Sequence, residues 1–266
     1  MRVFSERKFQ MKISVRHRFI KKIPVLEVVM DELKLAPLPL VIYYHGWQSS
    51  KELVLTQARK LAKKGIRVLL PDAMNHGERR VGAISTIPAM TFWSSVQFNL
   101  AEFSQLTHFY QKQGLIQNEK IGVGGVSMGG ITTCALLTQH PEIQVAACIM
   151  GTPAPTSYLQ LVLRTVAERD IFVPQDLPLL LNWLDNYDLA LNPSKLAKRP
   201  LLFWHGKEDE KIPFESAYDF YEEIKEQEYA ENVLFLVDEK ERHLVRSEVM
   251  DQVTEFFTEE LIGINE

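Results

Sequence analysis

The chain lacks any apolar run as long as a membrane span, and its first residues lack the uninterrupted apolar stretch of a secretory signal. Cysteine is scarce: Cys134 and Cys148 both lie in apolar runs, which favours reduced core residues over a disulfide framework. The net charge is only −4, so no strong overall field attracts nucleic acid. We therefore expect a cytoplasmic protein that binds neither a membrane nor nucleic acid.

What is present is typical of a globular domain, with 46% hydrophobic and 24% charged residues in a chain of 266. No internal repeat or low-complexity linker divides it, and we expect a single domain over residues 1–266. Short apolar runs alternate with segments of helical periodicity, which predicts an α/β fold with a mostly parallel sheet of about eight strands and helices on both faces. The expected strands are residues 9–19, 23–30, 40–44, 66–70, 120–124, 145–150, 201–204 and 233–237, and the expected helices are residues 51–64, 91–113, 130–139, 215–227 and 245–261.

Two segments of this pattern have a distinct character. The basic first strand alternates through Phe9, Met11, Ile13 and Val15, which predicts an edge strand with its cations on the solvent face. Residues 152–196 interrupt the strand–helix alternation and contain five of the 13 prolines, with helical patches at 157–168 and 177–187. Because this segment falls between two sheet strands, we expect a small cap over the ligand crevice at the carboxyl ends of the strands.

The pentapeptide Gly125-Val126-Ser127-Met128-Gly129 joins a β-branched run to a helical run. A G-x-S-x-G string between a strand and a helix is typical of a nucleophile elbow, in which the serine hydroxyl stands at the top of a sheet. The alternative is a glycine-rich turn that serves only close packing. The context favours Ser127 as a nucleophile.

A serine nucleophile needs a base, and the base needs an acid that orients it. When the elbow is present, these follow in the order serine, acid, histidine. Of the seven histidines, two follow the cap, and His205 ends a strand where we expect a structural role, so His243 is the predicted base. Its alternative is a surface histidine in a charged loop.

The acid is expected just after the strand at 201–204, where Asp209 is the choice. Glu208 and Glu210 beside it are interpreted as solvated loop charges, and Asp238 is a second candidate for the acid.

The remaining site residues are predicted from their place on the same face of the sheet. The backbone N–H of Met128 and that of Trp47 are the expected oxyanion donors. His76 is expected to line the site, and an apolar pocket is predicted from Phe92, Trp93, Trp183 and Tyr187, although core packing would explain the same aromatics. No second ligand lies at a useful spacing from His76, so we expect no metal site.

Together these residues make the chain resemble the α/β-hydrolase superfamily, and within it the small dienelactone-hydrolase-like and prolyl-oligopeptidase-like serine esterases. The resemblance is carried by His45-Gly46-Trp47, Asp72 with His76-Gly77, the elbow, His205-Gly206-x-x-Asp209-x-x-Ile212-Pro213 and His243. It implies an α/β-hydrolase fold and hydrolysis without a cofactor. It also implies Ser127, His243 and Asp209 as nucleophile, base and acid.

The sequence thus predicts a carboxylesterase that cleaves small or medium acyl esters through an acyl-enzyme, with a small-molecule substrate. Three alternatives stay open: a thioesterase or acyltransferase, a peptidase with the same triad, and a binding module that has lost catalysis. A homodimer is compatible with the sequence.

Overall fold

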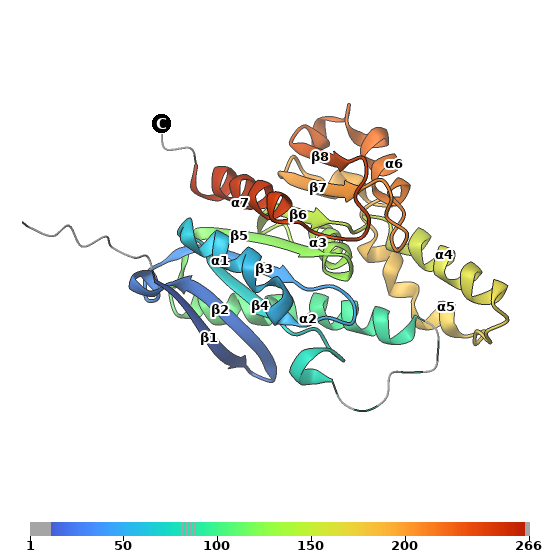
Figure 1. Cartoon of the computed structure of the whole chain (residues 1–266), viewed down its shortest axis with the longest axis horizontal. Coiled ribbons are helices and arrows are strands. Elements are labelled where there is room, and N and C mark those ends of the chain that lie inside the picture. Colours follow the sequence, from blue (N-terminus) through green and yellow to red (C-terminus); the bar gives the residue numbers. More distant parts are fainter. Residues whose placement is uncertain (1–11, 81, 83–84, 86, 88, 264–266) are drawn as a thin grey trace, which may run out of the picture.

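The computed structural model describes residues 12–80, 82, 85, 87 and 89–263, and its centre is an eight-stranded sheet in the order β1-β2-β4-β3-β5-β6-β7-β8 (Figure 1). β1 pairs antiparallel with β2 and β2 antiparallel with β4, while the other neighbours are parallel. The predicted fold class is confirmed. The strands are β1 Ile13–Ile20, β2 Ile23–Met30, β3 Leu38–Tyr44, β4 Arg67–Pro71, β5 Ile116–Val126, β6 Ile143–Ile149, β7 Leu201–Gly206 and β8 Val233–Asp238.

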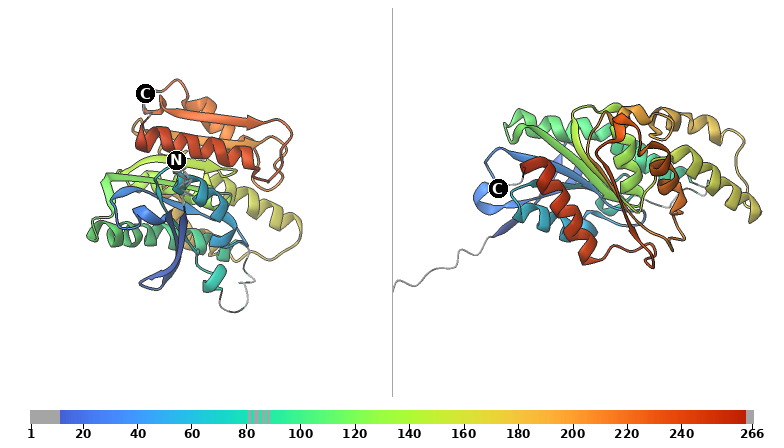
Figure 2. Two further views of the ribbon diagram at one scale, coloured as in Figure 1. Left: turned by 60° about the vertical axis from the view of Figure 1, so that its left-hand side comes forward. Right: turned by 90° about the horizontal axis from the view of Figure 1, so that it is seen from above.

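Helices cover both faces of the sheet, as the continuous apolar strands require (Figure 2). One face packs against α1 Leu55–Lys63 and α7 Ser247–Ile262, which form one apolar cluster with the strands. The other face packs against three helices that form the larger cluster: α2 Met90–Lys112, α3 Met128–Gln139 and α6 Glu215–Ile224. Four short 3₁₀ turns join these elements: η1 Asp31–Leu33, η2 Lys51–Val54, η3 Gly77–Arg79 and η6 Glu228–Ala230.

The segment between β6 and β7 lies at the end of the sheet toward which the arrows of β5 and β7 point (Figure 1). It contains α4 Pro155–Glu168, α5 Leu177–Leu180, η4 Asn182–Tyr187 and η5 Pro193–Leu196. Buried leucines attach it to the cluster around α3, and these are Leu159, Leu177, Leu181, Leu184, Leu189 and Leu196. α3 is therefore covered on both sides, which explains why nearly all of its residues are buried.

The edge strand β1 carries its charges differently from the prediction. Arg16 and Arg18 are only 27% and 33% exposed and both bind Glu27, whose side chain is fully buried. Val15 and Phe19 occupy the solvent face instead. The prediction of cations on the solvent face is wrong because a buried carboxylate on β2 needs positive partners, and the inward side of β1 supplies them. Phe9 and Met11 lie outside the described residues.

Within the part of the chain that the structure describes, no helix has both the length and the apolarity to cross a bilayer.

Candidate active site

The predicted nucleophile, Ser127, lies between the end of β5 and the start of α3. Its backbone has φ +56° and ψ −115°, a strained conformation for a residue with a side chain. Two glycines make this turn possible. A Cβ on Gly125 would lie 2.6 Å from the Gly129 carbonyl oxygen, and a Cβ on Gly129 would lie 2.2 Å from the Tyr44 carbonyl oxygen. The tight turn leaves the serine hydroxyl at the carboxyl end of the sheet, as an elbow requires.

Three side chains that are far apart in the sequence form one hydrogen-bonded chain. The Ser127 hydroxyl oxygen lies 2.9 Å from His243 Nε2, and His243 Nδ1 lies 2.7 Å from Asp209 Oδ2. The carboxylate can only accept, so Nδ1 carries the imidazole proton and Nε2 is free to accept from the serine. Asp209 and His243 lie on the loops after β7 and β8, which are neighbouring parallel strands.

The carboxylate of Asp209 is held in its ionised form. Burial alone would raise its pKa, but hydrogen bonds from His205 and His243 outweigh burial and hold the pKa well below its ordinary value. The backbone N–H groups of Lys211 and Ile212 donate to Oδ1 at 2.9 and 3.1 Å, which leaves Oδ2 for the histidine.

A second histidine, His205, also contacts the Asp209 carboxylate. Its Nε2 lies 2.9 Å from the Ile212 carbonyl oxygen and 3.2 Å from Asp209 Oδ2. The structural role expected for His205 thus includes support of the acid.

The other acids considered are elsewhere. Glu208 and Glu210 are exposed, and both lie near Arg242. Asp238 accepts the N–H groups of Lys240 and Glu241 and so shapes the turn that leads to His243. Of the four candidates, Asp209 is the one whose carboxylate contacts the imidazole.

The two expected oxyanion donors lie on either side of the serine. A Cβ built on Gly46 would lie 3.5 Å from the Ser127 Cβ, so the loop that carries Trp47 passes directly over the elbow. Met128 is the first residue of α3, where backbone N–H groups have no partner within the helix. Within residues 12–80 and 89–263, neither the Trp47 amide nor the Met128 amide donates to another described residue.

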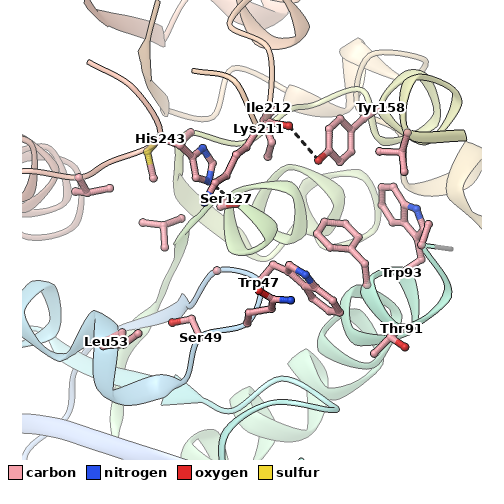
Figure 3. Close-up of a pocket in the computed structure, with 18 of the residues that line it drawn as sticks. Trp47, Ser49, Leu53, Thr91, Trp93, Ser127, Tyr158, Lys211, Ile212 and His243 are labelled. Atoms are coloured by element: carbon pink, nitrogen blue, oxygen red, sulfur yellow. Dashed lines mark hydrogen bonds between the residues drawn. The ribbon is translucent and has the colours of Figure 1, made fainter. Parts of the chain in front are cut away.

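Ser127 and His243 line a cavity of about 650 Å³. Figure 3 shows Trp47 across the cavity from His243. The lining is largely aromatic and aliphatic, with a few polar residues and one cation, Lys211, and among the described lining residues none is a carboxylate. The Tyr158 hydroxyl donates to the Lys211 carbonyl oxygen at 3.3 Å, which joins α4 to the loop of the acid. The aromatic lining residues are Trp47, Phe92, Trp93 and Tyr158, and the apolar ones include Leu53, Val126, Met150, Leu244 and Val245.

The predicted pocket residues are divided by the structure. Phe92 and Trp93 line the cavity, with their ring centroids 5.0 Å apart, whereas Trp183 and Tyr187 do not line it. Those two rings contact each other on η4 and pack against the cluster around α3, because the buried Leu184 between them turns this segment toward the helix.

His76 is also outside this cavity. Its ring is buried behind Trp47, with centroids 4.8 Å apart, and its Nδ1 lies 2.8 Å from the Met74 carbonyl oxygen. It therefore supports the aromatic lining rather than facing the space above Ser127.

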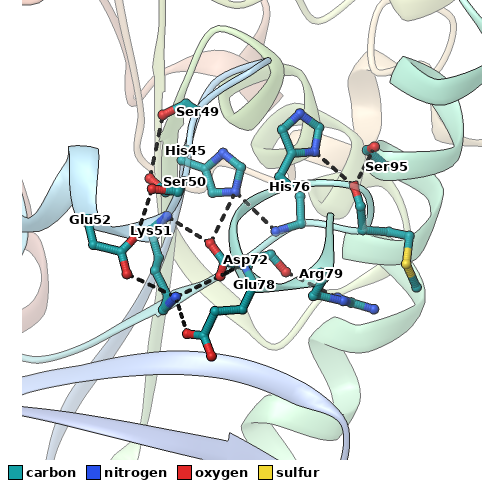
Figure 4. A network of polar contacts seen from close by, with 12 residues as sticks. His45, Ser49, Ser50, Lys51, Glu52, Asp72, His76, Glu78, Arg79 and Ser95 are labelled. Atoms are coloured by element: carbon teal, nitrogen blue, oxygen red, sulfur yellow. Dashed lines mark hydrogen bonds and ion pairs between the residues drawn. The ribbon is translucent and has the colours of Figure 1, made fainter. Parts of the chain in front are cut away.

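Sequence reasoning missed two features. The first is Tyr158, and its only signal was its position in the segment between two sheet strands. The second is a polar network behind the Trp47 loop, in which the buried Lys51 Nζ binds the buried Asp72 Oδ2 at 2.7 Å and Oε1 of the partly exposed Glu78 at 2.6 Å (Figure 4). Burial alone would lower the pKa of Lys51, but these carboxylates raise it well above its ordinary value. A lysine at the start of a helical segment gives no signal in the sequence that it will be buried.

Within the described residues, no group of three or more histidine, cysteine, aspartate or glutamate side chains is placed to hold a metal ion.

Comparison with known proteins agrees with this geometry. The sequence pattern of the prolyl oligopeptidase family matches residues 97–262. The chain belongs to this family. It is a serine hydrolase, and the resemblance noted in the sequence is confirmed.

Three proteins similar to this chain match it over nearly their full length. The putative esterase YitV of Bacillus subtilis is 36% identical over 250 residues, which is 92% of this chain and 98% of YitV. The esterase YjfP of Escherichia coli is 29% identical over 254 residues, which is 94% of this chain and 100% of YjfP. The solved structure of TT1662 from Thermus thermophilus has a TM-score of 0.76 at 19% identity, over 94% of this chain and 99% of TT1662.

Proposed function

We propose that this serine hydrolase is a carboxylesterase that cleaves small or medium acyl esters, with Ser127 as nucleophile, His243 as base and Asp209 as the orienting acid. The observation that carries the proposal is the unbroken hydrogen-bonded chain from Asp209 through His243 to Ser127, which opens into an apolar cavity. The names of the two esterases at 36% and 29% identity support it.

The geometry supports the following sequence of steps. The Ser127 oxygen attacks the ester carbonyl carbon while its proton passes to His243 Nε2, and the carbonyl π-electrons move onto oxygen. The N–H groups of Trp47 and Met128 stabilise this oxyanion. When it collapses, the C–O bond to the alcohol breaks, and the alcohol leaves with the proton from His243. A water molecule, deprotonated by the same imidazole, then attacks the acyl-enzyme and releases the acid and Ser127.

The cavity supports an uncharged, apolar acyl group as the substrate's main feature. A volume of about 650 Å³ admits a small or medium chain together with the alcohol, and the aromatic lining residues offer flat apolar surfaces. In this proposal residues 152–196 act as a cap within a single domain, because Tyr158 and Val162 of α4 form part of the lining.

The first test is the hydrolysis of p-nitrophenyl esters of increasing chain length. We expect activity that peaks at short or medium chains, and we expect Ser127→Ala to lower kcat by several orders of magnitude (at least about 10⁴-fold). Activity unchanged in this variant would remove Ser127 from the mechanism.

A fluorophosphonate probe separates an enzyme from a binding module, because only an activated serine takes the label. A folded wild-type protein that never labels would favour the binding module. Product analysis with acyl-CoA, competing alcohols and a peptide substrate separates an esterase from a thioesterase, an acyltransferase and a peptidase.

Two further proposals concern the state of the protein. The buried free thiols of Cys134 and Cys148 support a reducing compartment, and we propose the cytoplasm. The homodimer stays a prediction, and light scattering after gel filtration measures the mass of the particle against 30.6 kDa for one chain.

A further inference from the structure

His45 follows directly after β3 and begins the loop that carries Trp47. Its ring is almost completely buried, at 1% exposure, and it has two hydrogen-bond partners. The backbone N–H of Ala73 points at Nε2 at 3.1 Å, and Nδ1 lies 2.8 Å from the carbonyl oxygen of Gly46. A backbone N–H can only donate, so Nε2 is the bare nitrogen and Nδ1 carries the proton. His45 therefore donates its Nδ1–H to Gly46.

That carbonyl belongs to the same peptide group as the N–H of Trp47. A trans peptide is planar, and its C=O and N–H point in opposite directions. A donor that holds the Gly46 oxygen on one side therefore fixes the direction of the Trp47 N–H on the other. A hydrogen bond to the carbonyl also polarises the amide and makes its N–H a better donor.

We propose that His45 is a positioning residue of this enzyme, which locks the Gly46–Trp47 peptide so that the Trp47 N–H is aimed at the developing oxyanion. This inference rests on the proposed function. It assigns a role in catalysis to a histidine that contacts neither the substrate cavity nor the Ser127–His243–Asp209 chain.

Hydrogen bonds around His45 fix its position (Figure 4). Ala73 and its neighbour Asp72 follow β4, and Asp72 accepts the Lys51 N–H at 3.0 Å and the Lys51 ammonium at 2.7 Å. The loop from His45 to Lys51 is thus attached at both ends to the same pair of residues. The Glu78 N–H also donates to Asp72, at 3.0 Å.

The neutral ring is the form that this arrangement needs. Burial lowers the pKa of His45 to about 4, so at neutral pH the ring carries one proton. The neighbouring His76 is no substitute, because its Nδ1 bonds to Met74 and its ring packs on Trp47.

Two substitutions separate the two hydrogen bonds of His45. In His45→Asn the amide nitrogen occupies the place of Nδ1 and can still donate to Gly46, but the partner of Ala73 is lost. In His45→Gln the amide oxygen occupies the place of Nε2 and can still accept from Ala73, but the donor to Gly46 is lost. Each variant keeps one bond, so a purely structural role predicts similar losses in both.

Steady-state hydrolysis of a p-nitrophenyl ester is measured for both variants and the wild type. We expect His45→Gln to lower kcat by about 10- to 100-fold with KM nearly unchanged, because an oxyanion donor acts in the transition state, and we expect His45→Asn to recover most of the loss. The inference is overturned if His45→Gln keeps kcat within about threefold of the wild type, or if His45→Asn is impaired as much as His45→Gln.

A measurement on the wild type keeps the inference testable if a variant does not fold. Protein labelled with ¹⁵N-histidine should show His45 protonated at Nδ1 at neutral pH, and a ring protonated at Nε2 would overturn the inference. A wild type that neither hydrolyses esters nor takes a fluorophosphonate overturns the proposed function and this inference with it. An active wild type whose kcat is unaffected by His45→Gln overturns this inference alone.

Discussion

Asp209→Asn tests the hydrogen-bonded chain of Asp209, His243 and Ser127 with the least change in side-chain shape. The two oxygens of Asp209 have different partners, because Oδ1 accepts the N–H groups of Lys211 and Ile212 while Oδ2 accepts from His243. An asparagine at this position must keep its carbonyl oxygen toward the two backbone donors. Its NH₂ group is then forced to face the imidazole.

This orientation changes the tautomer of the base. An NH₂ group cannot accept from Nδ1–H, so the histidine ring must carry its proton on Nε2 instead. Nε2 then has no lone pair for the Ser127 proton, although it lies only 2.9 Å from the serine oxygen. His205 adds to the conflict, because its Nε2 lies 3.2 Å from Oδ2 and would also face the new NH₂ group.

We expect kcat to fall by about 10⁴-fold, which is the loss measured when the acid of the trypsin triad is changed to asparagine. That factor corresponds to about 5 kcal/mol of transition-state stabilisation. The assay is the hydrolysis of a p-nitrophenyl ester together with the rate of fluorophosphonate labelling, with circular dichroism as the check on folding. Glu208→Gln and Glu210→Gln are the matched controls, since both side chains are exposed, and we expect them to stay within about threefold of the wild type. A folded Asp209→Asn variant that keeps about a tenth of the activity would refute the tautomer argument.

Three further predictions concern the cavity and the fold. Phe92→Ala should lower kcat/KM for p-nitrophenyl butyrate by about tenfold, because an apolar contact in the cavity is lost. In Trp183→Ala, kcat/KM should stay within about threefold of the wild type, since of these two residues Phe92 alone lines the cavity. Equal losses in both variants would contradict this. Gly77→Ala should lower the free energy of unfolding by about 2–4 kcal/mol, because a Cβ at φ +50° would lie 2.2 Å from the buried carboxylate of Asp72. Gly65→Ala is the control, since the space around it is open, and it should lower the free energy of unfolding by only about 1 kcal/mol. Urea unfolding measures both. The folded-state pKa of His45, about 4, lies below the ordinary 6.5, so its contribution to stability is present above pH 6.5 and is lost as the pH falls to 4. The free energy of unfolding, measured in urea, should therefore fall by up to about 3 kcal/mol over this range. In His45→Gln it should fall by correspondingly less.

The sheet and the chain of three side chains could be read from the sequence, because both depend on local patterns in a fixed order. Continuous apolar runs separated by helical periodicity determine a parallel sheet. In such a sheet every loop at the carboxyl end faces the same crevice. Ser127, Asp209 and His243 follow β5, β7 and β8, which are parallel, and this placement is enough to predict that they meet.

Side-chain direction in the segment between β6 and β7 could not be read in the same way. Their aromatic character predicts that Trp183 and Tyr187 line the cavity, but the buried Leu184 turns η4 toward α3. The sequence does not show which leucine of this segment will be buried. Tyr158 lines the cavity, and no motif in the sequence marks it.

Buried charge was the second limit. The alternation in β1 predicts apolar residues inside. Ile13 does pack against the core, but Val15 and Phe19 are exposed, because Glu27 on the next strand is buried and binds Arg16 and Arg18. Only the pairing of the two strands reveals that Arg16 and Glu27 stand opposite each other.

The segment between β6 and β7 has a consequence for how this scaffold can diversify. β6 and β7 pair directly, so the segment leaves and rejoins the sheet without altering the order of the strands. If this segment is the proposed cap, exchanging it as a unit changes the substrate range, while the proposed catalytic residues on the other loops stay in place. A replacement segment must also contain apolar side chains that cover α3, because without them this helix, which follows the elbow, would be exposed to water.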